Sequence, residues 1–163
     1  MRLTAHTDYA LRILMFAAAR KREGEARARF SVEEVATAYD ISRNHAMKIV
    51  QRLAGAGYLA STRGRGGGLE LGTTAETVRL GALVRYLEQD QTLAACFGCE
   101  EPCRIGGKCT LERALHIALD AFFASLDRLT LADIALTPGA LSLLESFAHA
   151  PQDKGNQGAT PAP

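Results

Sequence analysis

The chain has 163 residues, of which 47% are hydrophobic and 23% charged, and its formal net charge is +1. These values are typical of a soluble protein with one compact core or two small lobes. No stretch approaches 18 consecutive apolar residues, which excludes a transmembrane helix, and the opening residues MRLTAHTDYALR lack the pattern of a secretory signal. We therefore expect a cytoplasmic protein with no membrane partner.

Thr7 is the expected N-cap of the first helix, which runs to about Arg20 and has apolar residues on nearly all sides. Such a helix is expected to be buried between two partners. The polar sequence KREGEARARF then predicts a loop. Ser31 and Glu34 form a capping-box pattern that opens a short helix ending near Tyr39.

Another helix is expected after Ser42, which is a suitable N-cap. It carries one apolar stripe at helical spacing: Ala46, Ile49, Val50 and Leu53. Gly55 and Gly57 provide its end. Two short alternating segments come next, YLASTR and LELG, and the glycine-rich sequence GRGGG separates them. This pattern predicts a β-hairpin with a basic tip. This order of elements indicates a winged helix-turn-helix.

The C-terminal half is expected to be helical around one irregular segment. A helix is predicted from about Arg79 to Glu88, and a second, long helix after Cys109. The long helix carries an apolar seam with alternating spacings of three and four: Leu111, Leu115, Ala118, Phe122, Leu126 and Leu129. This spacing is typical of a coiled coil and predicts a dimerisation helix. One or two short apolar helices are expected after it.

The sequence thus predicts a mainly α protein with a small β-hairpin wing. We expect a winged helix-turn-helix domain in residues 1–78, a cysteine-containing loop with dimerisation helices in 79–148, and a disordered tail rich in proline and glycine in 149–163.

Charge is distributed unevenly along the chain. The 29 residues from Ile41 to Leu69 contain no Asp or Glu but include five Arg or Lys residues. With the apolar stripe of the second helix facing inward, the outward or flanking residues include Arg43, Asn44, His45, Lys48 and Gln51. Arginine, asparagine and glutamine bind base edges, whereas lysine mostly binds phosphates. Arg63 and Arg65 lie in the hairpin tip, close enough in sequence to contact the DNA backbone together. These residues predict a DNA-binding face.

All four cysteines lie within the segment CFGCEEPCRIGGKC, at positions 96, 99, 103 and 109. Clustered cysteines in a cytoplasmic protein favour metal binding over disulfides. Three alternatives fit the spacing: a structural zinc site, an iron–sulfur cluster, or a redox pair formed by Cys96 and Cys99. The spacing alone does not separate zinc from an iron–sulfur cluster. The chain has no nucleotide-binding glycine motif and no paired carboxylates in an apolar setting, so we do not expect an enzyme.

Five stretches of the chain resemble a known family in the same order: LTAHTDYALR, SRNHAMKIV, RGRGGGLEL, VRYLE and TLADI. They resemble the NsrR family of nitric-oxide-sensing repressors, whose wider relatives include the iron–sulfur regulator IscR. The resemblance covers residues 1 to about 145. It implies a homodimeric, operator-binding repressor that nitric oxide inactivates by destroying its iron–sulfur cluster.

The resemblance implies three cysteine ligands, Cys96, Cys103 and Cys109, and leaves Cys99 without a role. The fourth ligand that it implies is Asp8, donated by the other subunit, although Asp8 could equally pair with Arg12 four residues on. A [4Fe-4S] cluster is favoured by the resemblance, and a [2Fe-2S] cluster is possible with the same ligands. An IscR-like histidine ligand is expected three residues after the third cysteine, but Glu112 occupies that position. Sensing of cluster supply or redox state remains the alternative function on the same scaffold.

Overall fold

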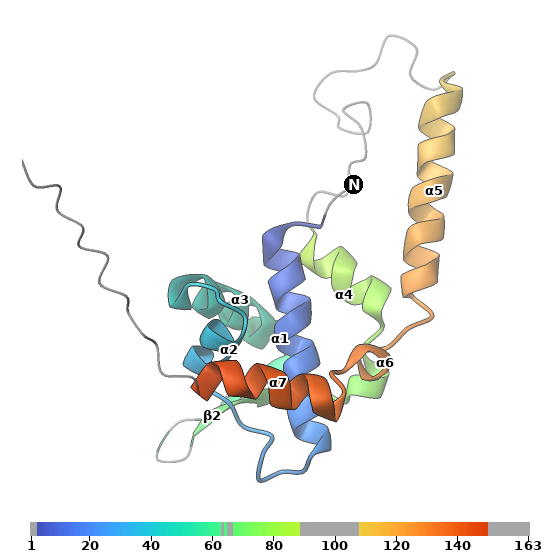
Figure 1. The fold of residues 1–163 in the computed structure, drawn as a ribbon. Coiled ribbons are helices and arrows are strands. Elements are labelled where there is room, and N and C mark those ends of the chain that lie inside the picture. The colour runs from blue at the N-terminus through green and yellow to red at the C-terminus, as the bar shows by residue number, and fades with distance from the viewer. Residues whose placement is uncertain (1–2, 63, 65–66, 89–107, 150–163) are drawn as a thin grey trace, which may run out of the picture.

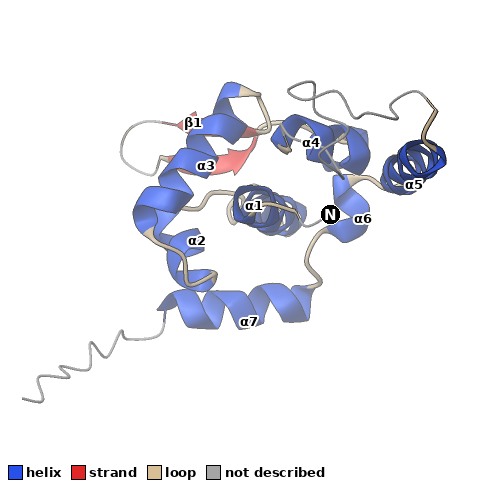
Figure 2. Ribbon diagram, turned by 90° about the horizontal axis from the view of Figure 1, so that it is seen from above, coloured by secondary structure: helices blue, strands red, loops and turns tan. Residues whose placement is uncertain are grey.

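The structure is a computed structural model, and it describes residues 3–62, 64, 67–88 and 108–149. The tail expected from 149 onwards lies outside the described residues except for His149 itself. Helix α1 (Ala5–Arg22) is the centre of the molecule, and Figure 2 shows it end-on with helices on most of its sides. Ala10, Ile13, Leu14, Phe16 and Ala17 on α1 are at most 1% exposed, so the prediction that this helix is buried between other elements is confirmed.

The N-cap of α1 is Thr4, not Thr7 as expected from the sequence. The Thr4 hydroxyl accepts a hydrogen bond from the Thr7 amide at 3.2 Å, and Thr7 itself is fully buried. The helix thus starts three residues earlier than predicted and ends at Arg22. Two threonines at this spacing are both suitable caps, and tertiary packing of α1 selects the first of them.

Helices α2 (Val32–Ala38) and α3 (Arg43–Gly55) form the helix-turn-helix. Both predicted caps are present: Ser31 and Glu34 form a complete capping box, and Ser42 caps α3 through the His45 amide. The predicted stripe of α3 is buried, with Ala46, Ile49 and Leu53 fully inaccessible. Gly57 has a positive φ of 79°, which explains a glycine directly after the helix.

Strands β1 (Leu59–Thr62) and β2 (Gly68–Leu71) pair antiparallel, with Leu59 opposite Leu71, and form the predicted wing. Phe30, which the sequence placed in a polar loop, bridges to Leu69 through two backbone hydrogen bonds of 2.7 and 2.9 Å. The Phe30 ring is buried and meets Phe16 edge-on. A single apolar residue after ten mostly polar ones gives no periodic signal, so this bridge could not be predicted.

The remaining elements are η1 (Ala75–Thr77), α4 (Leu80–Leu87), α5 (Thr110–Leu126), α6 (Leu131–Ile134) and α7 (Pro138–His149). Helix α7 lies against α2 and α1, and α6 lies against α1 and η1. Helix α5 stands at the side of the molecule, next to α4 (Figure 1). The described residues contain no helix long and apolar enough to cross a membrane.

Candidate DNA interface and cluster ligands

Helix α3 presents the predicted DNA-contacting residues on its solvent side. Arg43, Asn44, Lys48 and Gln51 are exposed, and His45 is half-buried. The first two occupy the first turn of the helix, from which side chains reach bases most directly when such a helix enters a major groove. The hairpin residues Arg63 and Arg65 lie outside the described residues.

Two residues that sequence reasoning missed belong to this face. Met47 is 43% exposed on α3, and its sulfur lies 3.2 Å from Arg43 Nη1. Glu33 on α2 places its carboxylate 3.1 Å from Arg43 Nε. Met47 could have been found from its i, i+4 spacing to Arg43, whereas the contact with Glu33 depends on the turn between the two helices.

His45 connects the recognition helix to the first turns of α1. Its ring meets the ring of Tyr9 edge-on at 5.5 Å and lies 6.5 Å from the ring of His6. The pKa of His6 is lowered by burial and, to a smaller extent, by its electrostatic interactions with Arg52 and His45, while Glu88 acts in the opposite direction. The first turn of α3 is therefore packed directly on the end of α1 that carries Asp8.

Asp8 is about half exposed and pairs with Arg12, whose Nε lies 3.0 and 3.1 Å from its two carboxylate oxygens. The alternative raised by the sequence, an i, i+4 ion pair, is thus present. The pair is exposed, and such pairs contribute little to stability, about 0.3–0.5 kcal/mol. The Asp8 carboxylate can therefore exchange this partner for another at small cost.

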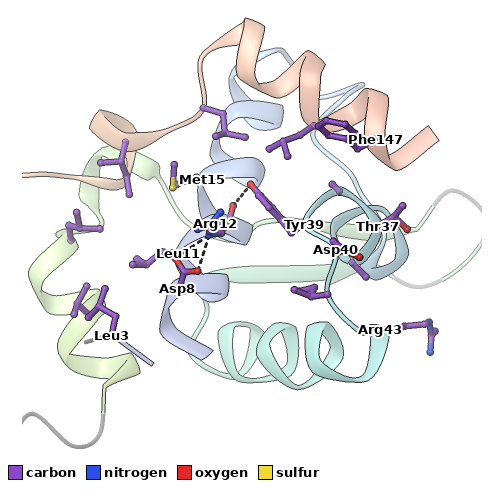
Figure 3. Close-up of a pocket in the computed structure, with 18 of the residues that line it drawn as sticks. Leu3, Asp8, Leu11, Arg12, Met15, Thr37, Tyr39, Asp40, Arg43 and Phe147 are labelled. Carbon is purple, nitrogen blue, oxygen red and sulfur yellow. Dashed lines mark hydrogen bonds and ion pairs between the residues drawn. The ribbon is translucent and has the colours of Figure 1, made fainter. Parts of the chain in front are cut away.

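Asp8 lies on a large open groove with a cavity volume of about 1320 Å³. Figure 3 shows Asp8 and Arg12 pointing into it beside Leu11 and Met15 of α1. Apolar side chains of other helices complete the lining, among them Val84, Phe122, Leu126 and Phe147. Tyr39 also lines it and donates a hydrogen bond to the Arg12 carbonyl at 3.0 Å; burial raises the pKa of this phenol to about 12.

Among the predicted cysteine ligands, Cys109 is described and Cys96 and Cys103 are not. Cys109 is half-buried, is not in a disulfide and occupies the N-cap position of α5. No group of three or more potential metal ligands comes together within the described part of the chain. In both ribbon views the start of α5 lies away from the start of α1 (Figures 1 and 2).

A helix-turn-helix with a hairpin wing and a cationic second helix defines a transcription regulator that binds DNA. The family model described as Rrf2, "Iron-dependent Transcriptional regulator", matches residues 3–137. The chain belongs to the Rrf2 family. The expectation that the protein is not an enzyme agrees with this family.

Curated relatives support the assignment. The HTH-type transcriptional regulator NsrR of Bacillus subtilis is 42% identical over 135 residues, which cover 82% of this chain and 90% of the relative. The NsrR of Geobacillus kaustophilus is 39% identical over 135 residues, covering 82% and 89%. The resemblance to NsrR predicted from the sequence is therefore confirmed, and the chain is a transcriptional regulator of the NsrR type.

Solved structures show the same fold. CymR, the global cysteine regulator of B. subtilis, superposes with a TM-score of 0.64 at 28% identity, covering 83% of this chain and 96% of that chain. IscR of T. potens also superposes with a TM-score of 0.64, at 20% identity over 82% of this chain and 85% of that one. The mainly α fold with a winged helix-turn-helix is thus confirmed.

Proposed function

We propose that the protein is a homodimeric repressor whose affinity for double-stranded operator DNA depends on an iron–sulfur cluster, and that nitric oxide lowers this affinity by destroying the cluster. Cys96, Cys103 and Cys109 of one protomer bind the cluster, which is [4Fe-4S] in preference to [2Fe-2S]. Asp8 of the partner subunit supplies the fourth ligand.

The described ligands have the chemistry that this role requires. Cys109 is half-buried at the N-cap position of α5 and is not in a disulfide, so its sulfur is available to bind iron. Asp8 is half exposed and engaged in a weak surface pair. A carboxylate is a hard ligand and a poor partner for a soft iron–sulfide site, which makes it the ligand most easily displaced.

The proposal rests chiefly on the position of Asp8 at a large apolar groove. The same chain has an apolar helix to place there: on α5, Leu111 is 63% and Ile117 59% exposed. In the proposed dimer, α5 of the partner lies in this groove with its N-terminal end, which carries Cys109, towards Asp8. Within one chain the starts of α5 and α1 lie apart, which favours ligation between subunits over ligation within one.

The DNA contacts follow from the exposed face of α3. Arg43 and Asn44 contact base edges, Lys48 and Gln51 contact bases or phosphates, and Arg63 and Arg65 of the wing contact the backbone. His45 belongs to this set but also packs on α1. Operator half-sites lie one helical turn apart, so the separation of two α3 helices in the dimer controls affinity.

A bound cluster would supply the iron with which nitric oxide reacts. Asp8 would join α1 of its own protomer to the cluster held by the other protomer's cysteines, and without that bond α1 and the recognition helix packed on it would no longer be tied to the other protomer. A repressor that binds about 100-fold more weakly after the signal needs ~2.7 kcal/mol of coupling, which is within the usual range for allosteric proteins.

The test uses full-length protein purified without oxygen, with a duplex selected from a random-sequence pool by the iron-loaded protein. We expect broad visible absorbance, tight binding by the loaded form, and release as nitric oxide is titrated. Colourless protein with stoichiometric zinc would refute the iron–sulfur proposal. Retention of DNA during destruction of the cluster would refute the sensing proposal.

The main alternative is sensing of cluster supply or redox state. It predicts that removal of the cluster by a chelator changes DNA binding, whereas nitric oxide at doses close to the cluster concentration leaves operator binding unchanged. Comparing operator binding with residual cluster absorbance across both titrations separates the two.

A further inference from the structure

Glu88 is the C-cap residue of α4, immediately before the segment that carries Cys96 and Cys103. The residue is 5% exposed, which is unusual for a carboxylate. Its Oε1 accepts a hydrogen bond of 2.6 Å from the Thr4 amide and one of 3.1 Å from the Thr4 hydroxyl. Since Thr4 caps α1, this carboxylate fastens the start of α1 to the last turn of α4.

The same turn of α1 contacts the recognition helix. His6 and Tyr9 of α1 both lie against the ring of His45, at centroid distances of 6.5 and 5.5 Å. Asn44 and Lys48, on either side of His45 along α3, belong to the proposed DNA-contacting set. A shift of the first turn of α1 is therefore transmitted through ring packing to the first turn of α3.

The last turn of α4 also contacts α3 directly, near its other end. Arg52 Nη2 donates to the Tyr86 carbonyl at 2.6 Å, and the guanidinium lies 5.1 Å from the centroid of the Tyr86 ring. The end of α4 is thus held to both helices, to α1 through Glu88 and to α3 through Arg52. We call these contacts of Glu88, Thr4, His6, His45, Arg52 and Tyr86 the α4 junction.

A carboxylate is well suited to this position. Hydrogen bonds to an ionised acceptor are about twice as strong as neutral ones, and negative charge is favoured at a helix N-terminus. Because Glu88 is buried, its removal would leave two donors of Thr4 without this acceptor. The contact therefore joins the last turn of α4 directly to the first turn of α1.

We propose that Glu88 is a positioning residue that couples the cysteine-bearing segment to the recognition helix within one protomer, by way of Thr4, His6 and His45. The inference rests on the proposed function and adds to the route across the dimer through Asp8. Glu88 holds the last turn of α4, which leads into the cysteine segment, to the start of α1, so that a displacement of this turn would shift α1 and then α3.

The test is the ratio of operator affinities between iron-loaded and metal-free protein, measured on the full chain with the duplex selected by the loaded parent. Glu88→Ala should reduce this ratio by about fivefold or more, which is the lower end of typical allosteric coupling. Its iron and sulfide content should equal that of the parent. Glu88→Gln retains an oxygen that accepts from Thr4, so it should keep the ratio within about twofold. Glu76→Ala on exposed η1 is the control for loss of charge.

His6→Ala provides a second measurement that does not depend on the stability of the Glu88 variant. It should reduce the ratio similarly, and the double variant should lose no more than the larger single effect if both residues act along one route. A parental ratio in either alanine variant, or equal loss in Glu88→Ala and Glu88→Gln, would overturn the inference. Loss of iron from Glu88→Ala would also overturn it, because Glu88 would then act on cluster binding. If the parent itself shows no difference between loaded and metal-free forms, the proposed function fails instead.

Discussion

Arg43 begins the recognition helix with its guanidinium held beside the carboxylate of Glu33. Both side chains are more than half exposed, at 62% and 65%, so water solvates the pair and it adds little to stability. The ion pair between Arg43 and Glu33 matters instead for DNA binding. The carboxylate restrains an arginine that is proposed to contact bases, and it repels phosphates that approach the same surface.

We expect Glu33→Gln to strengthen binding to non-operator duplex by about two- to fivefold at low salt, as for an exposed interaction of ~0.4–1 kcal/mol. Discrimination between operator and non-operator DNA should fall, because Arg43 loses a neighbour that orients it. The measurement is parallel titration of the selected duplex and a scrambled one.

Glu25→Gln is the matched control for this change. Glu25 is also an exposed carboxylate with a cationic partner, Lys21 at 2.7 Å, but it lies in the loop after α1. It should leave both affinities unchanged. Equal binding of scrambled DNA by the parent and Glu33→Gln would show that Glu33 has no effect on the DNA-binding face.

At the scale of elements, caps and periodicity predicted the helix-turn-helix closely. The capping box of Ser31 and Glu34 and the cap Ser42 are local signals, and the structure has both. Prediction was weaker where distant residues decide. The cap of α1 is Thr4 because the helix packs on α4, and Phe30 becomes a bridge because Leu69 lies beside it.

The candidate site was also predictable only where local patterns determine which residues are exposed. Residue types and helical spacing predicted that Arg43, Asn44 and Lys48 face solvent, because burial of the opposite stripe of α3 requires it. They did not predict Glu33 or Glu88, since each acts through contact with another helix. Such contacts depend on how helices cross, and no local pattern encodes that.

Gly81 tests the packing of α4 against the end of α5. A Cβ atom at this position would lie 2.7 Å from the carboxyl carbon of Asp127 and 3.1 Å from its backbone nitrogen. Asp127 cannot easily move away, because Arg85 binds both of its oxygens at 2.8 and 2.9 Å. We expect Gly81→Ala to destabilise the fold by about 1–3 kcal/mol, as other overpacked substitutions do.

Gly139 on α7 is the control, because a Cβ atom there meets nothing within 4 Å. Gly139→Ala should be neutral or stabilising by about 0.5–1 kcal/mol, as for glycine in a helix. Urea denaturation of both metal-free variants at one protein concentration measures the difference. Similar stabilities for the two variants would mean that α4 and Asp127 are not in close contact.

At the scale of the whole molecule, α5 differs from the other long helices. It buries Phe123, over which the Arg85 guanidinium lies at 4.4 Å, but much of its surface is apolar and exposed. The sequence predicted an apolar seam there and interpreted it as a dimer contact. Leu111 and Phe122 of this seam are exposed, which supports that interpretation, since a monomer would leave them in water. Ile117, which lies outside the predicted seam, adds a further exposed apolar side chain to the surface of α5.

Ile117 is the residue on which to test the proposed dimer. It lies in the middle of α5 and is 59% exposed, so a glutamate there should leave the fold of one protomer unchanged. In a dimer, a charge at a buried apolar contact is strongly unfavourable. We therefore expect Ile117→Glu to shift the protein to monomer in analytical ultracentrifugation. Ile117→Leu keeps the apolar contact and should remain dimeric.

The same variant connects assembly to DNA binding. A monomer engages one half-site, so Ile117→Glu should lose most of its operator affinity even when the α3 surface is intact. Binding of Ile117→Leu should be close to that of the parent. A dimeric Ile117→Glu protein would place the subunit contact elsewhere. A monomer with parental operator affinity would show that one recognition helix is enough for binding. It would contradict the proposal that the spacing of two α3 helices controls affinity.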